Sequence, residues 1–205
     1  MGFSELAVLT IHDVKNNLAQ LVAAAESRGD MASMLVAQHA SEALTRLLCY
    51  YRSEAHFLDI VVEPASPAEL IDDLIQALAN HLREHQNIKL EIDLSQAPAI
   101  SFFDKTLIQM VLANALQNTM RYAKSTVQLT VIEQDAHLEI CLRDDGAGYP
   151  EGVLTDTDNS PVTEQGTGLG LRLARRVLAL HVNQGRCGEI ILSNEGGAVF
   201  RLILP

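Results

Sequence analysis

The sequence contains no tryptophan and only 4% aromatic residues, so its core must be built from aliphatic side chains. It also lacks any run close to the roughly 18 uninterrupted apolar residues of a membrane span, and it shows no secretory signal pattern. The three cysteines, Cys49, Cys141 and Cys187, are widely spaced within apolar runs, which predicts small reduced core residues rather than disulfides or a metal site. We therefore expect a cytoplasmic protein with no membrane insertion by this chain.

Positive charge is also scarce. The sequence has 15 lysine and arginine residues against 26 aspartate and glutamate residues, a formal net charge of −11. This balance argues against a nucleic-acid binder and against docking on an anionic membrane. The hydrophobic content of 48% is ample for a buried core, and 205 residues suit one large domain or an ordinary domain plus a small one.

Two N-terminal stretches have the periodicity of amphipathic helices. In residues 4–28 and again in residues 31–55, apolar side chains recur three and four positions apart. Arg28-Gly29-Asp30 between them is a turn signal, so we expect an antiparallel helical hairpin. A lone hairpin cannot bury its apolar stripe, whereas two copies form a four-helix bundle. We therefore expect a homodimer, with residues 1–56 as the helical domain.

Residues 57–205 alternate between strand and helix patterns. Strands are predicted over 57–63, 88–94, 127–131, 138–142, 190–192 and 199–204. Helices are predicted over 66–85, 105–123 and 171–181, the first two beginning at the capping residues Ser66 and Asp104. This order predicts an α/β sandwich with one mixed sheet and helices on one face, which makes the whole chain α+β. Residues 149–165 have no periodicity and are expected to be functional or disordered.

Two glycine-rich loops lie in the second half of the sequence. The first, Asp144-Asp145-Gly146-Ala147-Gly148, follows a strand pattern, and the second, Gly166-Thr167-Gly168-Leu169-Gly170-Leu171, runs into a helix pattern. Glycine lets a backbone approach a ligand, and amides at a helix start favour phosphate. Asp144 would repel phosphate, so it is better suited to accept a hydrogen bond from a donor such as an adenine amino group. Either loop alone could be a plain turn.

The helix predicted over residues 105–123 carries an unusual polar face. Asn114, Asn118, Arg121 and Tyr122 are spaced three and four apart, and asparagine is not a preferred residue inside a helix. An asparagine oxygen suits Mg²⁺ that keeps several waters, and arginine offers a planar donor fork to phosphate oxygens. The alternative is a solvated polar face.

His12 is the one histidine with neighbours suited to chemistry. Asp13 beside it could orient the imidazole and accept a proton while the other ring nitrogen attacks an electrophile. Asn16, one helical turn on, could position water or the same phosphoryl group. The alternative is an ordinary surface histidine.

Together these segments resemble the transmitter core of sensor histidine kinases, which joins a dimerisation and phosphoacceptor hairpin to a Bergerat-type ATP-binding domain. The resemblance covers nearly the whole chain. Residues 12–16 resemble the phosphoacceptor box, residues 104–122 the N box, residues 144–148 the G1 box and residues 166–171 the G2 box.

The resemblance implies an ATP-dependent protein-histidine kinase with Mg²⁺ as its metal. His12 would be the phosphorylated nucleophile, Asp13 its general base, and Asn16 a residue supporting dephosphorylation of a partner response regulator. Asn118 would ligate Mg²⁺, and residues 149–165 would form a lid. The nucleotide would also contact a set of residues drawn from the N, G1 and G2 boxes: Asn114, Arg121, Tyr122, Asp144, Gly146, Gly148, Gly166, Thr167, Gly168, Leu169 and Gly170. The implied partners are a second copy, a response-regulator receiver domain and an upstream sensor.

The sequence also departs from the family pattern. Residues 149–165 contain no phenylalanine, so the phenylalanine-containing F box is absent or replaced, and Thr119 stands where a small alanine is usual. Only eleven residues precede His12, so we expect either a piece of a larger sensor kinase or a protein signalled by a partner. Two other functions stay open: a histidine phosphotransfer protein that does not use ATP, and an ATP-operated interaction module or serine/threonine kinase on the same fold.

Overall fold

The computed structural model describes residues 3–54, 58–155 and 168–205, and the chain divides into two compact units, Met1–Leu58 and Asp59–Pro205. Within the described residues, no helix combines the length and the apolar character needed to cross a membrane. Each unit has its own secondary structure and is described by itself below.

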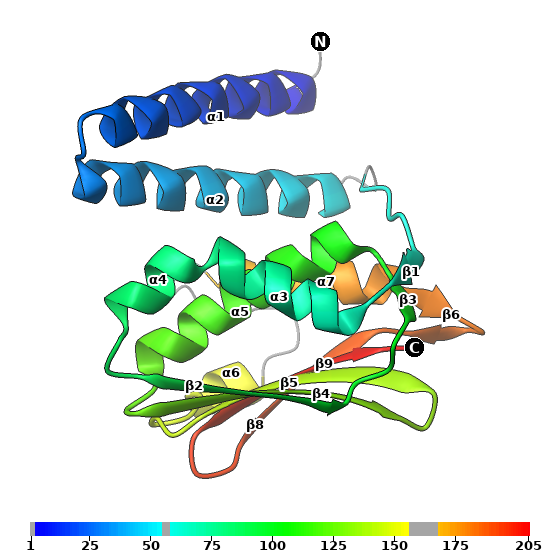
Figure 1. The fold of residues 1–205 in the computed structure, drawn as a ribbon. Coiled ribbons are helices and arrows are strands. Elements are labelled where there is room, and N and C mark those ends of the chain that lie inside the picture. Colours follow the sequence, from blue (N-terminus) through cyan, green and yellow to red (C-terminus); the bar gives the residue numbers. More distant parts are fainter. Residues whose placement is uncertain (1–2, 55–57, 156–167) are drawn as a thin grey trace. The chain divides into compact units, whose positions relative to one another are not determined.

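The first unit is the predicted helical hairpin. Its helices are α1 (Phe3–Ser27) and α2 (Met31–Glu54) (Figure 1). Gly29 has a left-handed φ of 67°, which turns the chain, and the Asp30 carboxylate accepts a hydrogen bond from the Ser33 amide at 3.1 Å to begin α2. Leu21 and Val36 are 55% and 70% exposed, so the packing of α1 against α2 leaves apolar surface of the hairpin uncovered. The four-helix bundle remains a prediction.

The second unit is built on a five-stranded mixed sheet with the strand order β2-β4-β5-β9-β8. Its strands are β2 (Lys89–Gln96), β4 (Thr126–Gln134), β5 (His137–Asp144), β8 (Glu189–Asn194) and β9 (Ala198–Leu204). β2 and β4 are parallel and every other pair is antiparallel. On β5, Leu138, Ile140 and Leu142 are buried, so the alternation of the sequence gives the sheet one core-facing side.

Helices cover that core-facing side of the sheet (Figure 1). They are α3 (Pro67–Ala77), α4 (Ala79–Glu84), α5 (Lys105–Tyr122) and α7 (Leu169–Leu180). The predicted caps are confirmed, since Ser66 Oγ accepts from the Glu69 amide at 3.4 Å and Asp104 Oδ1 accepts from the Leu107 amide at 2.9 Å. The α+β class with a mixed sheet is therefore confirmed.

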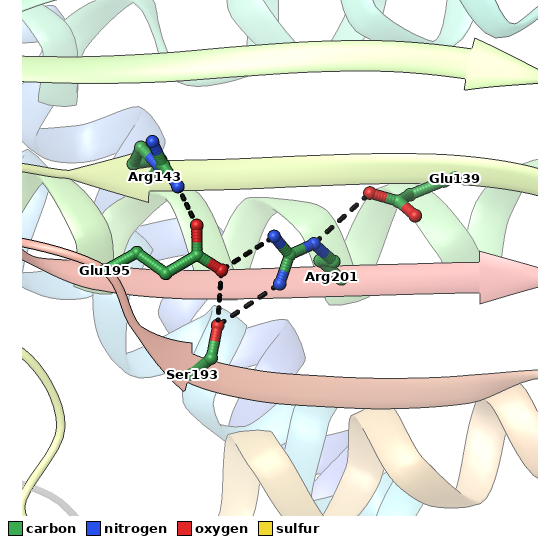
Figure 2. Close-up of polar contacts among 5 residues, drawn as sticks. All are labelled: Glu139, Arg143, Ser193, Glu195 and Arg201. Carbon is green, nitrogen blue, oxygen red and sulfur yellow. Dashed lines mark hydrogen bonds and ion pairs between the residues drawn. The ribbon is translucent and has the colours of Figure 1, made fainter.

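The opposite side of the sheet carries a network of charged side chains. Arg201 on β9 contacts Glu139 of β5 at 3.4 Å and Glu195 of the β8–β9 turn at 2.8 Å, and Glu195 also pairs with Arg143 (Figure 2). Ser193 joins the same group through Glu195 and Arg201. These contacts tie the β8–β9 turn to the end of β5.

Several predicted elements need correction. The strand expected over 57–63 is not formed in its described part: residues 58–62 have no regular structure, and β1 is only Glu63–Ala65, paired with β3 (Ser101–Phe103). The reason is local, since Val61 and Val62 stay exposed and the Val61 amide donates to the Asp104 carboxylate at 3.0 Å rather than to a strand.

Two further predictions are wrong in part. The helix expected over 66–85 breaks at Leu78, whose ψ of 9° is not helical, so α3 and α4 are separate. Cys187 is exposed, because it lies in the two-residue strand β7 (Arg186–Cys187), paired with β6 (Val182–Asn183) rather than with the main sheet. Residues expected to be aperiodic after 148 include a short helix, α6 (Glu151–Thr155), and the remainder of that stretch lies outside the described residues.

Candidate active site

Asp144, the last residue of β5, is buried with 6% of its surface exposed. Its Oδ1 atom accepts hydrogen bonds from the amides of Gly146 at 2.7 Å and Ala198 at 3.0 Å. No residue in the described ranges donates a hydrogen bond to Oδ2. Oδ2 is open to solvent, where a hydrogen-bond donor of a ligand could replace water.

The backbone around Asp144 leaves no room for a side chain at Gly146 or at Gly197. A Cβ on Gly146 would overlap the carbonyl oxygen of Tyr122 at the end of α5, and a Cβ on Gly197 would overlap the carbonyl oxygen of Asp144 itself. The end of α5, the loop after β5 and the β8–β9 turn therefore meet at Asp144. Glycine is needed here because the backbones approach closely.

Asn194, the last residue of β8, anchors the chain beyond the first glycine loop. Its side-chain oxygen accepts from the Tyr149 amide at 2.8 Å, and its side-chain nitrogen donates to the Tyr149 carbonyl at 2.9 Å. Gly148 has a φ of 82°, and a Cβ there would lie 2.7 Å from the Asn194 oxygen. Burial, helped by the nearby charge of Asp144, raises the pKa of the Tyr149 phenol, which therefore stays neutral.

Asp145 points to a different partner from its neighbour. Its carboxylate accepts from the amides of Lys124 at 2.8 Å, Ser125 at 3.0 Å and Thr126 at 3.2 Å, and from the Ser125 hydroxyl. These bonds hold the pKa of Asp145 well below its usual range, with the Ser125 hydroxyl as the largest cause. Asp145 thus fixes the connection from α5 to β4 instead of facing a ligand.

The start of α7 packs directly against α5. A Cβ on Gly170 would overlap the side-chain amide of Asn114, so the two helices meet at these residues. Gly168 takes a left-handed φ of 65° as the chain enters α7. A helix start of this kind presents backbone amides and the positive end of the helix dipole to an anion. Gly166 and Thr167 lie outside the described residues, whereas Leu169 opens the helix.

The other predicted residues of α5 lie on its last two turns. Asn118, Arg121 and Tyr122 are exposed, and the Arg121 guanidinium lies 5.7 Å from the centre of the Tyr122 ring. Within the described part of the chain, nothing hydrogen-bonds to the Asn118 side chain. A neutral, accessible amide oxygen of this kind fits a Mg²⁺ ion that keeps several waters. The structure thus brings Tyr122 to Gly146 and Asn114 to Gly170.

His12, Asp13 and Asn16 all lie on α1, in the first unit. Asp13 and Asn16 are exposed, and Asn16 is one turn from His12. The His12 side chain lies outside what the structure describes.

Sequence reasoning missed three residues of this site. Asn194 and Gly197 act through contacts between β8, β9 and the loop after β5, far apart in the chain, and Tyr149 has no distinctive neighbours. The only local signal was the turn sequence Asn194-Glu195-Gly196-Gly197.

A separate cavity of about 490 Å³ lies between β1, β3 and the starts of α3 and α5, and its lining does not include Asp144 or the glycine loops.

Comparison with known protein sequences agrees with this geometry. Residues 103–205 match the family described as histidine kinase-, DNA gyrase B-, and HSP90-like ATPase. The chain is 29% identical over 159 residues to the virulence sensor histidine kinase PhoQ of Salmonella typhimurium, covering 74% of this chain and 31% of PhoQ. It is 35% identical over 111 residues to the signal transduction histidine-protein kinase AfsQ2 of Streptomyces coelicolor, covering 50% of this chain and 20% of AfsQ2. The chain thus spans about a third or less of these relatives.

Solved structures share the fold. Full-length ShkA in complex with AMPPNP aligns with a TM-score of 0.73 and 19% identity, covering 98% of this chain and 45% of ShkA. Histidine kinase ThkA in complex with the response regulator protein TrrA aligns with a TM-score of 0.61 and 18% identity, covering 98% of this chain and 61% of that chain. The residues that match the family include α5, the described parts of both glycine loops and the strands around Asp144. The chain therefore belongs to the histidine kinase-, DNA gyrase B- and HSP90-like ATPases, and sensor histidine kinases are among its relatives.

Proposed function

We propose that this chain is the catalytic and phosphoacceptor portion of an ATP-dependent protein-histidine kinase. In this proposal His12 takes the γ-phosphoryl group of ATP and passes it to an aspartate of a response regulator. The observation that carries the proposal is the buried Asp144 carboxylate, whose Oδ1 is held by two backbone amides while Oδ2 is left for a ligand donor.

The second unit would bind the nucleotide. Asp144 Oδ2 would accept a hydrogen bond from the adenine amino group, beside segments that pack closely because Gly146, Gly148 and Gly197 have no side chains. The first turn of α7 would receive the phosphates, and Asn118 would hold Mg²⁺ with Asn114 and Arg121 nearby. The AMPPNP complex of ShkA, which has the same fold, supports a nucleotide site in this unit.

The first unit would supply the phosphoacceptor. ATP brings the γ-phosphoryl group, and the chain's task is to present an imidazole nitrogen of His12 with its lone pair free. Asp13 is suited to hold the ring and accept its proton, which keeps the nucleophile neutral. Asn16 is exposed one turn further along α1, and we assign it to dephosphorylation of the regulator rather than to autophosphorylation.

The proposed partners follow from the same assignment. The ThkA–TrrA complex supports a response-regulator receiver domain as the phosphoryl acceptor. The exposed Leu21 and Val36 support a second copy of the chain, which would complete a four-helix bundle over residues 1–56 while residues 57–205 serve as the ATP-binding domain. We place this activity in the cytoplasm, where ATP and reduced cysteines coexist.

Transfer of labelled γ-phosphate from Mg-ATP tests the proposal. The unaltered chain should acquire label that is labile in acid and stable in alkali, and His12→Ala should acquire none. His39→Gln, a change of an exposed histidine on α2, is the matched control and should label like the unaltered chain. Label that persists in His12→Ala would reject His12 as the acceptor. Protein that binds Mg-ATP yet never labels, with or without a receiver domain, would reject the kinase.

A further inference from the structure

Three side chains with metal-binding atoms gather at the end of α4, and the proposed kinase activity does not use them. His81, Glu84 and His85 are spaced three and four residues apart, which places them on the same face of the chain as it leaves the helix. Each offers one ligand atom, and these atoms all lie within 4.8 Å of one another. Two imidazoles and a carboxylate at such separations form the donor set of a three-ligand metal site.

The ring of His85 is already oriented for coordination. Its Nδ1 atom lies 3.0 Å from the carbonyl oxygen of His81, and because a carbonyl can only accept, Nδ1 carries the proton. The lone pair is then on Nε2. Metal-bound histidines typically donate their second ring nitrogen to a carbonyl or carboxylate in this way, which fixes the tautomer and the direction of the ligand.

His81 and Glu84 complete the group. The two imidazole centres of His81 and His85 are 4.4 Å apart, and His81 Nδ1 lies 3.8 Å from Glu84 Oε2. Ligand atoms of a tetrahedral zinc ion are about 3.3 Å apart, given metal–ligand bonds of about 2.0–2.1 Å. The Glu84 side chain is 40% exposed, so it can rotate to bring its carboxylate closer to His81. The His81 side chain is only 14% exposed, so it is the less mobile of the two ligands.

We propose that His81, Glu84 and His85 bind one divalent transition-metal ion, with Zn²⁺ as the best match and water as a fourth ligand. Imidazole nitrogens favour zinc, cobalt, nickel and copper over magnesium, so this site differs in chemistry from the oxygen ligand offered by Asn118. Such an ion would tie the last turn of α4 to the segment that leads into β2. It would stabilise the folded chain because the unfolded chain does not hold the three ligands together.

Calorimetric titration of ZnCl₂ into chelator-treated, dialysed protein tests this site. The unaltered chain should bind one equivalent of zinc. His85→Gln and Glu84→Gln should each lower the affinity for zinc by roughly tenfold or more. His137→Gln, which removes a histidine on β5, is the control and should bind like the unaltered chain. Co²⁺ should give the visible absorption of a tetrahedral nitrogen and oxygen site, and that absorption should be lost in His85→Gln.

The fold of each variant is checked by its melting temperature without metal. Glu84→Gln alters an exposed side chain and, without metal, should melt at the same temperature as the unaltered chain. Zinc should raise the melting temperature of the unaltered chain and of His137→Gln, but not that of Glu84→Gln or His85→Gln. If the unaltered chain binds no zinc, or if His85→Gln and Glu84→Gln bind it as tightly as the unaltered chain, the site does not exist. Binding that only His137→Gln removes would place the metal elsewhere.

Discussion

Asp144 and Asp145 are neighbours in the chain, yet their carboxylates have opposite roles. Asp144 is buried and no described residue donates a hydrogen bond to its Oδ2, whereas the Asp145 carboxylate accepts hydrogen bonds from the amides of Lys124, Ser125 and Thr126. Successive side chains along an extended chain point to opposite sides, so Asp144 at the end of β5 faces the core and Asp145 after it faces the start of β4. The Asp145 carboxylate therefore supports the fold, and the Asp144 carboxylate is the one that we propose to bind the nucleotide.

Replacing Asp145 with asparagine should destabilise the protein in a pH-dependent way. The pKa of Asp145 lies below its ordinary value of 3.8 in the folded chain, so its contribution is complete above that value and is lost as the pH falls below it. Urea unfolding of the unaltered chain and Asp145→Asn should differ equally at pH 7 and pH 5, and the difference should shrink below about pH 4. A difference that does not change with pH would contradict this role.

Gly197 is a second residue on which the site depends. Alanine there would place Cβ onto the carbonyl oxygen of Asp144, and both groups are backbone or fixed to it, so neither can give way. We expect Gly197→Ala to lower the free energy of unfolding by about 1–3 kcal/mol and to weaken ATP binding. Gly152→Ala in α6 is the control, since nothing lies within 4 Å of its Cβ. Equal stability of the two variants would contradict the close approach of Gly197 to the carbonyl oxygen of Asp144.

At the scale of elements, His181 links the end of α7 to the start of α5. The buried ring accepts from the Asp104 amide through Nε2 at 3.0 Å and lies 2.8 Å from the Val177 carbonyl through Nδ1. Because the amide donates and the carbonyl accepts, the ring is neutral with its proton on Nδ1. Asp104 also caps α5, so one contact joins the ends of two helices that border the proposed nucleotide site.

Acid should weaken this link. Burial lowers the pKa of His181 below its ordinary value of 6.5, which the Val177 carbonyl and the Asp104 charge only partly offset. Below pH 6.5 the unfolded chain therefore takes up a proton that the folded chain does not, so the free energy of unfolding decreases as the pH is lowered. Between pH 8 and pH 5, the unaltered chain should lose more unfolding free energy than His181→Gln, whose amide can keep both hydrogen bonds. If the free energy of unfolding depended on pH in the same way in both proteins, His181 would not be the source of this acid sensitivity.

At the scale of the whole molecule, local patterns predicted most of the elements. The hairpin α1–α2, the caps at Ser66 and Asp104, and the β4–β5 and β8–β9 hairpins each depend on residues close together in the sequence, and each is present. The glycine loops were equally visible, because positive φ at Gly148 and Gly168 leaves few alternatives to glycine.

Contacts between distant segments were not predictable in the same way. The hydrogen bonds between Asn194 and Tyr149 join residues 45 apart, and the close approach of Gly197 to Asp144 depends on β5 pairing with β9. Val61 and Val62 have strand-forming side chains, yet the Asp104 carboxylate takes the Val61 amide and no strand forms. Tertiary hydrogen bonds overrode β-propensity there, as they commonly do.

The affinity for Mg-ATP of the unaltered chain and of Asp144→Asn tests the central claim most directly. Asparagine keeps an oxygen for the Gly146 and Ala198 amides but places a donor where Oδ2 would accept from adenine, so affinity should fall roughly tenfold or more. Asp93→Asn on β2 is the matched control, and melting temperatures verify that both variants fold. Binding by Asp144→Asn as tight as that of the unaltered chain would contradict the proposed adenine site.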